Sequence, residues 1–204
     1  MIGPLHVVTD AHAPRSVVEQ ALAAARGGAW AVQLRDKTGS DEHVADTARA
    51  LLDCLAPFGT HLIINDRIEV AVAVGAHGLH IGQSDGDPVE ARLRIGPSMI
   101  LGLSIEAPAQ TAVMPSGIVD YVGAGPIHAT ASKADHALPM GLAGLRQVTR
   151  TVSVPVIAIG GLSATDIPAL KTAGAHGMAV ISAASRAADP ETAIRVMATA
   201  WGTP

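Results

Sequence analysis

Short apolar runs recur along this chain, and each is followed by a longer stretch with helical patterning. This alternation is typical of successive parallel βα units. Runs such as VIAIGG and MAVIS are apolar throughout, as expected of strands that are buried on both faces. We count eight predicted strands, which cover Leu5–Thr9, Ala31–Leu34, Leu62–Ile64, Gly78–Ile81, Ile100–Leu103, Tyr121–Gly123, Val156–Ile159 and Met178–Ile181.

Amphipathic segments between these runs predict helices, most clearly at Ser16–Arg26, Glu42–Leu55 and Ala143–Arg150. Eight βα units in succession predict a (β/α)₈ TIM barrel with eight parallel strands. A chain of 204 residues has room for a single such domain, spanning residues 1–204. An open, doubly wound sheet is the alternative that the same alternation allows.

The composition argues against several kinds of partner. Aromatic residues make up only 2% of the chain, which does not suit a surface that stacks bases, so nucleic acid is not expected. No run reaches the ~18 apolar residues of a membrane span, and the N-terminus lacks a basic segment followed by an apolar one. We expect a soluble, cytoplasmic protein with no membrane contact. Whether it forms a homo-oligomer is left open.

Charged and amide side chains follow the second predicted strand, in the motif QLRDK. Gln33, Arg35 and Lys37 alternate along it, so their side chains can project in the same direction. The formal net charge of −4 gives no general attraction for polyanions, so a phosphate site has to be built locally. Arg and Lys together can clamp the oxygens of a diphosphate. A solvated charge cluster is the alternative interpretation.

Two aspartates stand at the ends of the third and fourth predicted strands. In a TIM barrel the carboxyl ends of the strands meet around one mouth, so Asp66 and Asp85 can become neighbours. Carboxylate oxygens, completed by substrate phosphate and water, are the ligands that Mg²⁺ prefers. Each aspartate taken alone could equally cap a turn or a helix.

A second phosphate site is predicted at the ends of the last three strands. The segment Gly123–Lys133 carries small residues and then Thr130, Ser132 and Lys133, as expected of an anion-binding loop. Gly160-Gly161 and Ile181-Ser182 end the following two strands, where barrels often bind phosphate through main-chain N–H groups. A plain surface loop is the alternative for the first segment.

Soft-metal chemistry is not expected. Cys54 is the only cysteine, so neither a disulfide nor a cysteine-based metal site can form. None of the nine histidines has the spacing of a helical metal motif, and His77 and His80 stand three apart across a strand start, on opposite faces.

Taken together, these motifs resemble those of the thiamine phosphate synthase family, in order and over almost the whole chain. The motifs that carry the resemblance are LHVVTD, QLRDK, INDR, GLHIGQSD, GLS, DYVGAGPIHATASK, AIGG and VISA. Enzymes of that family are Mg²⁺-dependent transferases. They couple 4-amino-2-methyl-5-hydroxymethylpyrimidine diphosphate to a thiazole phosphate, which can be carboxylated, and release thiamine phosphate and diphosphate.

The resemblance implies a role for each matching residue. Asp66 and Asp85 would hold Mg²⁺. Arg35, Lys37 and Lys133 would be catalytic because the reaction needs positive charge beside its negatively charged leaving group. The pyrimidine diphosphate would contact Gln33, Leu34, Arg35, Asp36, Lys37, Asn65, Ser104 and Lys133. The thiazole phosphate would contact Thr130, Ala131, Ser132, Gly161, Ile181 and Ser182.

The chain departs from the family pattern at two histidines. His6 stands where the family usually has Tyr, and His128 stands where Phe is usual. Related thiazole tautomerases share the barrel and use a histidine in the sixth-strand loop, at the position of Pro126 here. A thiazole phosphate tautomerase and a noncatalytic thiazole phosphate sensor are therefore the alternative functions. The residues predicted to bind diphosphate and metal favour the synthase.

Overall fold

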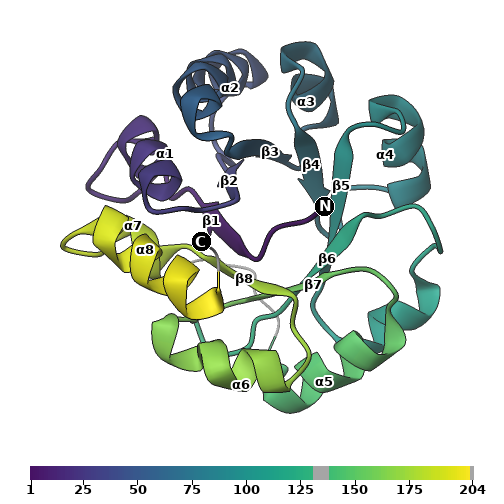
Figure 1. The fold of residues 1–204 in the computed structure, drawn as a ribbon. Helices are drawn as coiled ribbons and strands as arrows, with labels where there is room; N and C mark the ends of the chain where they lie inside the picture. Colours follow the sequence, from purple (N-terminus) through teal and green to yellow (C-terminus); the bar gives the residue numbers. More distant parts are fainter. Residues whose placement is uncertain (131–137, 203–204) are drawn as a thin grey trace.

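The computed structural model of the chain describes residues 1–130 and 138–202, and its centre is a closed barrel of eight parallel strands (Figure 1). Each strand pairs with the next along the chain, and the last closes the ring on the first. The TIM barrel prediction is confirmed and the open sheet is wrong. The strands are β1 (Leu5–Val8), β2 (Ala31–Leu34), β3 (His61–Asn65), β4 (Gly78–Ile81), β5 (Ile100–Ile105), β6 (Tyr121–Ala124), β7 (Val156–Ile159) and β8 (Gly177–Val180).

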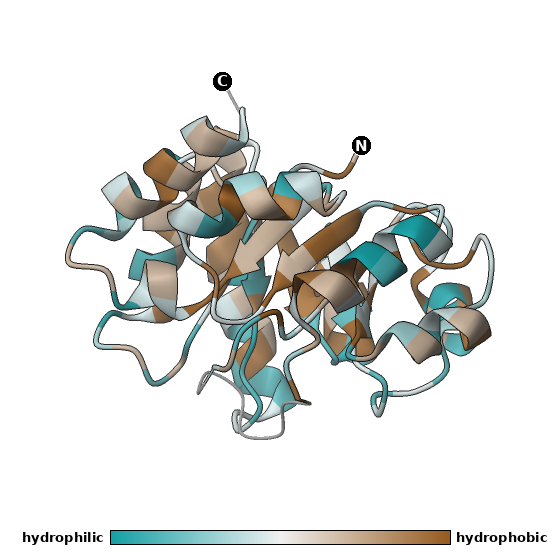
Figure 2. Ribbon diagram, turned by 90° about the horizontal axis from the view of Figure 1, so that it is seen from below, coloured by the Kyte–Doolittle hydropathy of each residue, from teal (hydrophilic) through white to brown (hydrophobic). Residues whose placement is uncertain are grey.

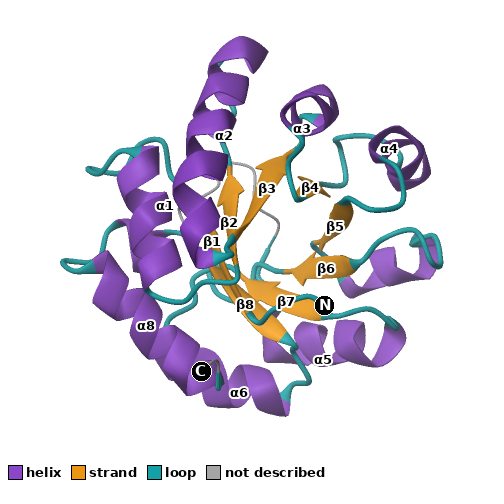
Figure 3. Cartoon of the chain, turned by 45° about the horizontal axis from the view of Figure 1, so that its top comes forward, coloured by secondary structure: helices purple, strands orange, loops and turns teal. Residues whose placement is uncertain are grey.

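Helices surround the barrel on its outside (Figure 3). All three helices predicted from amphipathic patterning form, and Ser16 caps the first by accepting from the main chain of Glu19. No helix within the described ranges is long and apolar enough to cross a membrane. The helices are α1 (Val17–Arg26), α2 (Asp41–Leu55), α3 (Ile68–Val74), α4 (Pro88–Ile95), α5 (Gly141–Thr151), α6 (Ile167–Thr172), α7 (Ser182–Ser185) and α8 (Pro190–Trp201), with 3₁₀ turns η1 (Ala56–Phe58), η2 (Pro108–Val113) and η3 (Ala164–Asp166).

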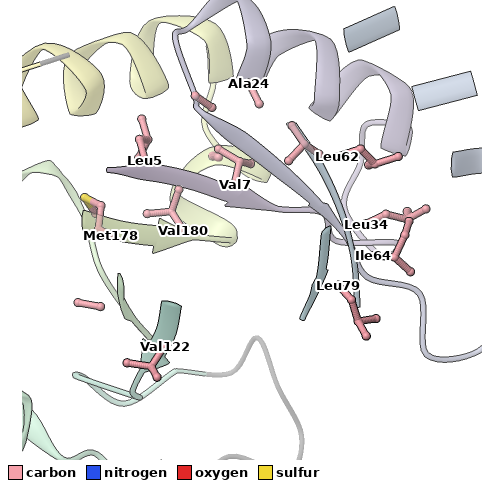
Figure 4. Close-up of a cluster of buried hydrophobic side chains, with 14 of the residues drawn as sticks. Leu5, Val7, Ala24, Leu34, Leu62, Ile64, Leu79, Val122, Met178 and Val180 are labelled. Carbon is pink, nitrogen blue, oxygen red and sulfur yellow. The ribbon is translucent and has the colours of Figure 1, made fainter. Parts of the chain in front are cut away.

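The main hydrophobic core lies between the barrel and its helices. Alternate residues of each strand point outward into it, as Leu62 and Ile64 do from β3 (Figure 4). Figure 2 shows hydrophobic colouring on the central strands and mixed colouring on the helices around them. The remaining strand residues point into the barrel, where Tyr121, Ile157 and Ala179 form a small apolar layer. Polar side chains such as Gln33, Asn65 and Ser104 also face the barrel interior, and the candidate site begins there.

Candidate active site

A hydrogen-bonded group of polar side chains lies inside the barrel. The His80 imidazole bonds through Nδ1 to the Tyr121 hydroxyl and through Nε2 to Ser104 Oγ, both at 2.9 Å. Gln33 hydrogen bonds to the same Tyr121 hydroxyl. Burial raises the pKa of Tyr121, so this residue remains a neutral phenol. These residues line a central pocket together with His6, Arg35 and Asn65, so the pocket carries polar groups whose positions are fixed.

Sequence reasoning predicted Gln33 and Ser104 for this place but missed His80 and Tyr121. The alternation of side chains along a strand could have indicated them, because His80 and Tyr121 stand at positions of β4 and β6 whose side chains point into the barrel. His6 is also inward and buried, where it packs against the rings of Trp30 and Tyr121. Burial lowers the pKa of His6 to about 4, so it is neutral at ordinary pH.

Arg35 and Lys37 follow β2 at the carboxyl end of the barrel, as predicted. The main-chain N–H of Arg35 donates to Thr9 Oγ1 at 3.0 Å, which ties this loop to the end of β1. Both side chains line an open pocket with Asn65, Ser104 and the start of the β4–α4 loop, residues 82–85. Two cations thus face one concave surface.

Asp66 and Asp85 converge on a single point, which the Lys37 ammonium occupies. Lys37 Nζ forms an ion pair with Asp66 and lies 3.8 Å from Asp85 Oδ1. Asn65 Nδ2 donates to Asp66 at 2.7 Å, and the Gly82 N–H donates to Asp85 at 2.7 Å, so both carboxylates are oriented. Their side chains are only 14% and 19% exposed. The structure brings together the two carboxylates that were predicted to be neighbours.

The two residues between the inward-facing ones in QLRDK have other surroundings. The Leu34 side chain is buried in the core outside the barrel, so only its main chain faces the mouth. The Asp36 carboxylate accepts from the N–H groups of Thr38 and Gly39, at 2.9 and 2.8 Å. Those hydrogen bonds, Gly39's first, lower the pKa of Asp36. Its side chain organises the loop that carries Lys37.

A third pocket lies beside the ends of β6, β7 and β8. Its lining includes Thr130, Gly160, Gly161, Ile181 and Ser182. Gly160 has φ 103° and Gly161 φ 66°, a conformation that side-chain-bearing residues rarely adopt. A Cβ on Gly161 would also lie 2.9 Å from the Ala129 carbonyl oxygen, so glycine lets the two loops approach. The predicted residues Ala131, Ser132 and Lys133 lie outside the described residues.

These three pockets meet at one residue. Ser104, at the carboxyl end of β5, lines all three. They are the central pocket, the open pocket that Arg35 and Lys37 line (the cationic pocket) and the pocket beside Gly160 and Gly161 (the glycine pocket). Arg35 and Asn65 join the first two, while Gly123 and Ile159 join the central pocket to the third. One mouth can therefore hold two ligands whose reacting ends meet.

His128 is turned toward the β7–α6 connection. Its Nε2 lies 2.9 Å from Asp166 Oδ1, and its side chain is 47% exposed. Partial burial works to raise the pKa of Asp166, but hydrogen bonds from Ser163 and His128 bring it below its usual value. His128 does not line the glycine pocket.

The chain is similar to known proteins of one family. A family model described as thiamine monophosphate synthase matches residues 5–184. The thiamine-phosphate synthase of Azorhizobium caulinodans is 44% identical over 197 residues, covering 96% of this chain and 93% of its own. That of Vibrio parahaemolyticus is 42% identical over 190 residues, covering 93% of each chain.

Solved structures show the same likeness. The thiamine phosphate pyrophosphorylase of Pyrococcus furiosus superposes with a TM-score of 0.88 at 30% identity, covering 97% of this chain and 95% of its own. A 3-hexulose-6-phosphate synthase, at 20% identity and a TM-score of 0.70 over 97% of this chain and 99% of its own, shares the fold alone. The match along the chain, the fold and the arrangement of the mouth lead to one conclusion: this chain belongs to the thiamine monophosphate synthase family.

Proposed function

We propose that this protein is a thiamine-phosphate synthase, which joins a pyrimidine diphosphate to a thiazole phosphate. The observation that carries the proposal is the meeting of three pockets at Ser104. The first is lined by Arg35, Lys37 and Asp85, the second lies inside the barrel, and the third has a glycine-lined wall. A substrate with a ring and a diphosphate fits the first two, and a partner with a single phosphate fits the third.

Arg35 and Lys37 would bind the diphosphate. Cations that face a site before the reaction stabilise the charge that develops on a leaving group, without reorganising at that moment. Leu34 would contribute only main-chain groups, because its side chain is buried in the core. The Asp36 carboxylate would hold the loop that carries Lys37 through its hydrogen bonds to Thr38 and Gly39. Lys133, the third cation proposed for catalysis, belongs to the part of the chain that the structure does not describe.

The donor set of Asp66 and Asp85 fits Mg²⁺. Both carboxylates already converge on one cation, the Lys37 ammonium. Among the described residues no cluster of three or more His, Cys, Asp or Glu side chains could hold a metal, so phosphate oxygens and water would supply the other ligands that Mg²⁺ requires. Bound there, the ion would neutralise part of the leaving group's charge.

The pyrimidine ring would enter the barrel, between Gln33, His80 and Tyr121. Their fixed donors and acceptors can orient a flat heterocycle with an amino group. The bond from the exocyclic methylene carbon to the diphosphate oxygen then breaks, and its electrons leave with diphosphate. The thiazole nitrogen donates its lone pair to the resulting pyrimidine cation and forms the new bond. This substitution needs no side-chain nucleophile.

The thiazole phosphate would lie in the glycine pocket. Gly161, Ile181 and Ser182 would offer main-chain N–H groups to its phosphate, and Thr130 lines the same pocket. We infer that Ala131 and Ser132 complete this site. We also expect the chain to act in the cytoplasm as one domain spanning residues 1–204.

The two alternative functions receive less support. The tautomerase hypothesis assigns catalysis to His128, whose imidazole instead bonds to Asp166. A sensor would have no use for cations and carboxylates arranged around one point. The two relatives named above, at 44% and 42% identity, are thiamine-phosphate synthases.

Incubation of the purified protein with both substrates and Mg²⁺ tests the proposal. We expect thiamine phosphate and diphosphate to form in equal amounts, and neither to form when a chelator removes the metal. Isomerisation of the thiazole phosphate alone, without metal or pyrimidine substrate, would instead establish the tautomerase.

A further inference from the structure

Arg67 joins the two loops that carry Lys37 and Asp66. Its guanidinium forms an ion pair with Asp41 through Nη1. Through Nη2 it donates to the carbonyl oxygens of Asp36, at 3.0 Å, and Gly39, at 2.6 Å. All three partners lie within residues 36–41, the segment that leads from β2 into α2 and includes Lys37. The planar donors of arginine suit such a clamp better than a lysine does.

The turn that precedes Arg67 is held in an unfavourable conformation. Asp66 has φ 54°, and in the described part of the chain it is the one residue other than glycine with a positive φ. The N–H of Arg67 donates to the Asn65 carbonyl at 2.8 Å, and the N–H of Asp66 donates to the His80 carbonyl at 2.8 Å. Such a conformation persists only where the surrounding structure enforces it, and it is common at functional sites.

The Arg67 side chain lies behind the site rather than in it. It is 20% exposed, its Nε is buried, and it does not line the cationic pocket. Its contacts fall on Asp36, one residue before Lys37, while its own main chain follows Asp66 directly. A shift of either loop would therefore change the spacing of the ammonium and the carboxylate across the site.

We propose that Arg67 is a positioning residue, which fixes the place of Lys37 relative to the Asp66–Asp85 pair without touching substrate. This inference rests on the proposed function, because that function requires the three groups to act on one diphosphate. Without the clamp, the loop of residues 36–41 and the Asp66 turn would keep their internal bonds but lose their fixed relation to each other.

Arg92 is a matched control for this role. Like Arg67, it donates to main-chain carbonyl oxygens and pairs with one aspartate. The carbonyls are those of Ile118, Gly96 and Met99, at 3.0, 2.9 and 2.7 Å, and the aspartate is Asp120. Its side chain is 16% exposed. Its partners precede β5 and β6, so it clamps loops at the amino end of the barrel, away from the site. Loss of either clamp should lower thermal stability, but only one should alter the site.

The experiment compares Arg67→Gln, Arg67→Lys and Arg92→Gln with the wild type. Calorimetry measures the binding of inorganic diphosphate at saturating Mg²⁺, and kinetics give KM for each substrate. We expect Arg67→Gln to weaken diphosphate binding and raise KM for the pyrimidine diphosphate by roughly tenfold or more, the effect of losing hydrogen bonds to a charged group. Arg67→Lys should retain part of the function. KM for the thiazole phosphate, and all values for Arg92→Gln, should stay within about twofold.

Two results would overturn the inference. One is wild-type diphosphate binding and KM in Arg67→Gln, and the other is an equal loss in Arg92→Gln, which would reflect general destabilisation. If Arg67→Gln does not fold, Arg67→Lys is judged by the same two criteria. A wild-type protein that binds no magnesium diphosphate and makes no product refutes the proposed function itself, so the two failures are distinguishable.

Discussion

At the scale of single residues, burial inside the barrel sets the protonation states of His6 and Tyr121. His6 is buried, and its Nε2 lies 3.1 Å from the Gly3 carbonyl oxygen. Desolvation lowers its pKa, and nearby His176 and His61 lower it further. The folded protein therefore keeps His6 neutral in a pH range where an unfolded chain would protonate it.

This difference makes the fold sensitive to acid. The pKa of His6 is about 4 in the folded state against 6.5 in the unfolded state, so between these values the unfolded chain binds more protons. The free energy of unfolding should thus fall as pH drops from 6.5 toward 4, by at most about 3 kcal/mol from this residue. Urea denaturation at several pH values in that range measures the free energy of unfolding, which should depend less on pH in His6→Tyr than in the wild type. Parallel curves for the two proteins would contradict the assignment.

The metal assignment makes a second prediction for single residues. Asp66→Asn and Asp85→Asn should each reduce Mg²⁺-dependent synthesis by about 100-fold or more, because each removes an anionic ligand. Both side chains lie at the mouth, so circular dichroism should show an intact fold. Asp87→Asn is the control, since Asp87 caps α4 two residues further on and an asparagine can also cap. Full activity in both variants would refute the metal site.

At the scale of elements, alternate residues of a strand serve different purposes. One set of side chains packs in the core and stabilises the fold, and the other points into the barrel and forms the site. Leu34 points into the core and its neighbour Gln33 points into the barrel. Leu34→Ala should lower the free energy of unfolding by about 2–5 kcal/mol, the usual result of a cavity in a core. Gln33→Ala should lower stability far less but impair synthesis. Chemical denaturation and steady-state kinetics of both variants would check this, and a reversed pattern would exclude the register described for β2.

The convergence of three loops makes Lys37 an internal counter-ion. Because its ammonium already pairs with both carboxylates, a divalent cation has to compete with it. Lys37→Met should therefore strengthen the binding of Mn²⁺ alone and weaken the binding of inorganic diphosphate, each by about tenfold. Lys37→Arg is the charge-matched control. Calorimetry measures both affinities, and a Mn²⁺ affinity that does not rise in Lys37→Met would contradict the counter-ion role.

At the scale of the whole molecule, the barrel was predictable because its signal is spread over many residues. Eight apolar runs and their helices fix the topology even where single boundaries differ by a residue or two. The meeting of strand ends at one mouth likewise predicted that Asp66 and Asp85 would be neighbours. The contacts of Arg67 were not predictable, because they join segments that lie far apart in the sequence. No local pattern encodes a guanidinium that reaches from Arg67 to Gly39.

The proposed reaction requires one mouth to hold both ligands, with Ser104 where they meet. A crystal structure with Mg²⁺, diphosphate and thiamine phosphate would show whether it does. We expect the metal on Asp66 and Asp85, diphosphate against Arg35 and Lys37, the pyrimidine ring between Gln33 and His80, and the product's phosphate at Gly161 and Ser182. Diphosphate bound elsewhere, or a metal on other side chains, would contradict it.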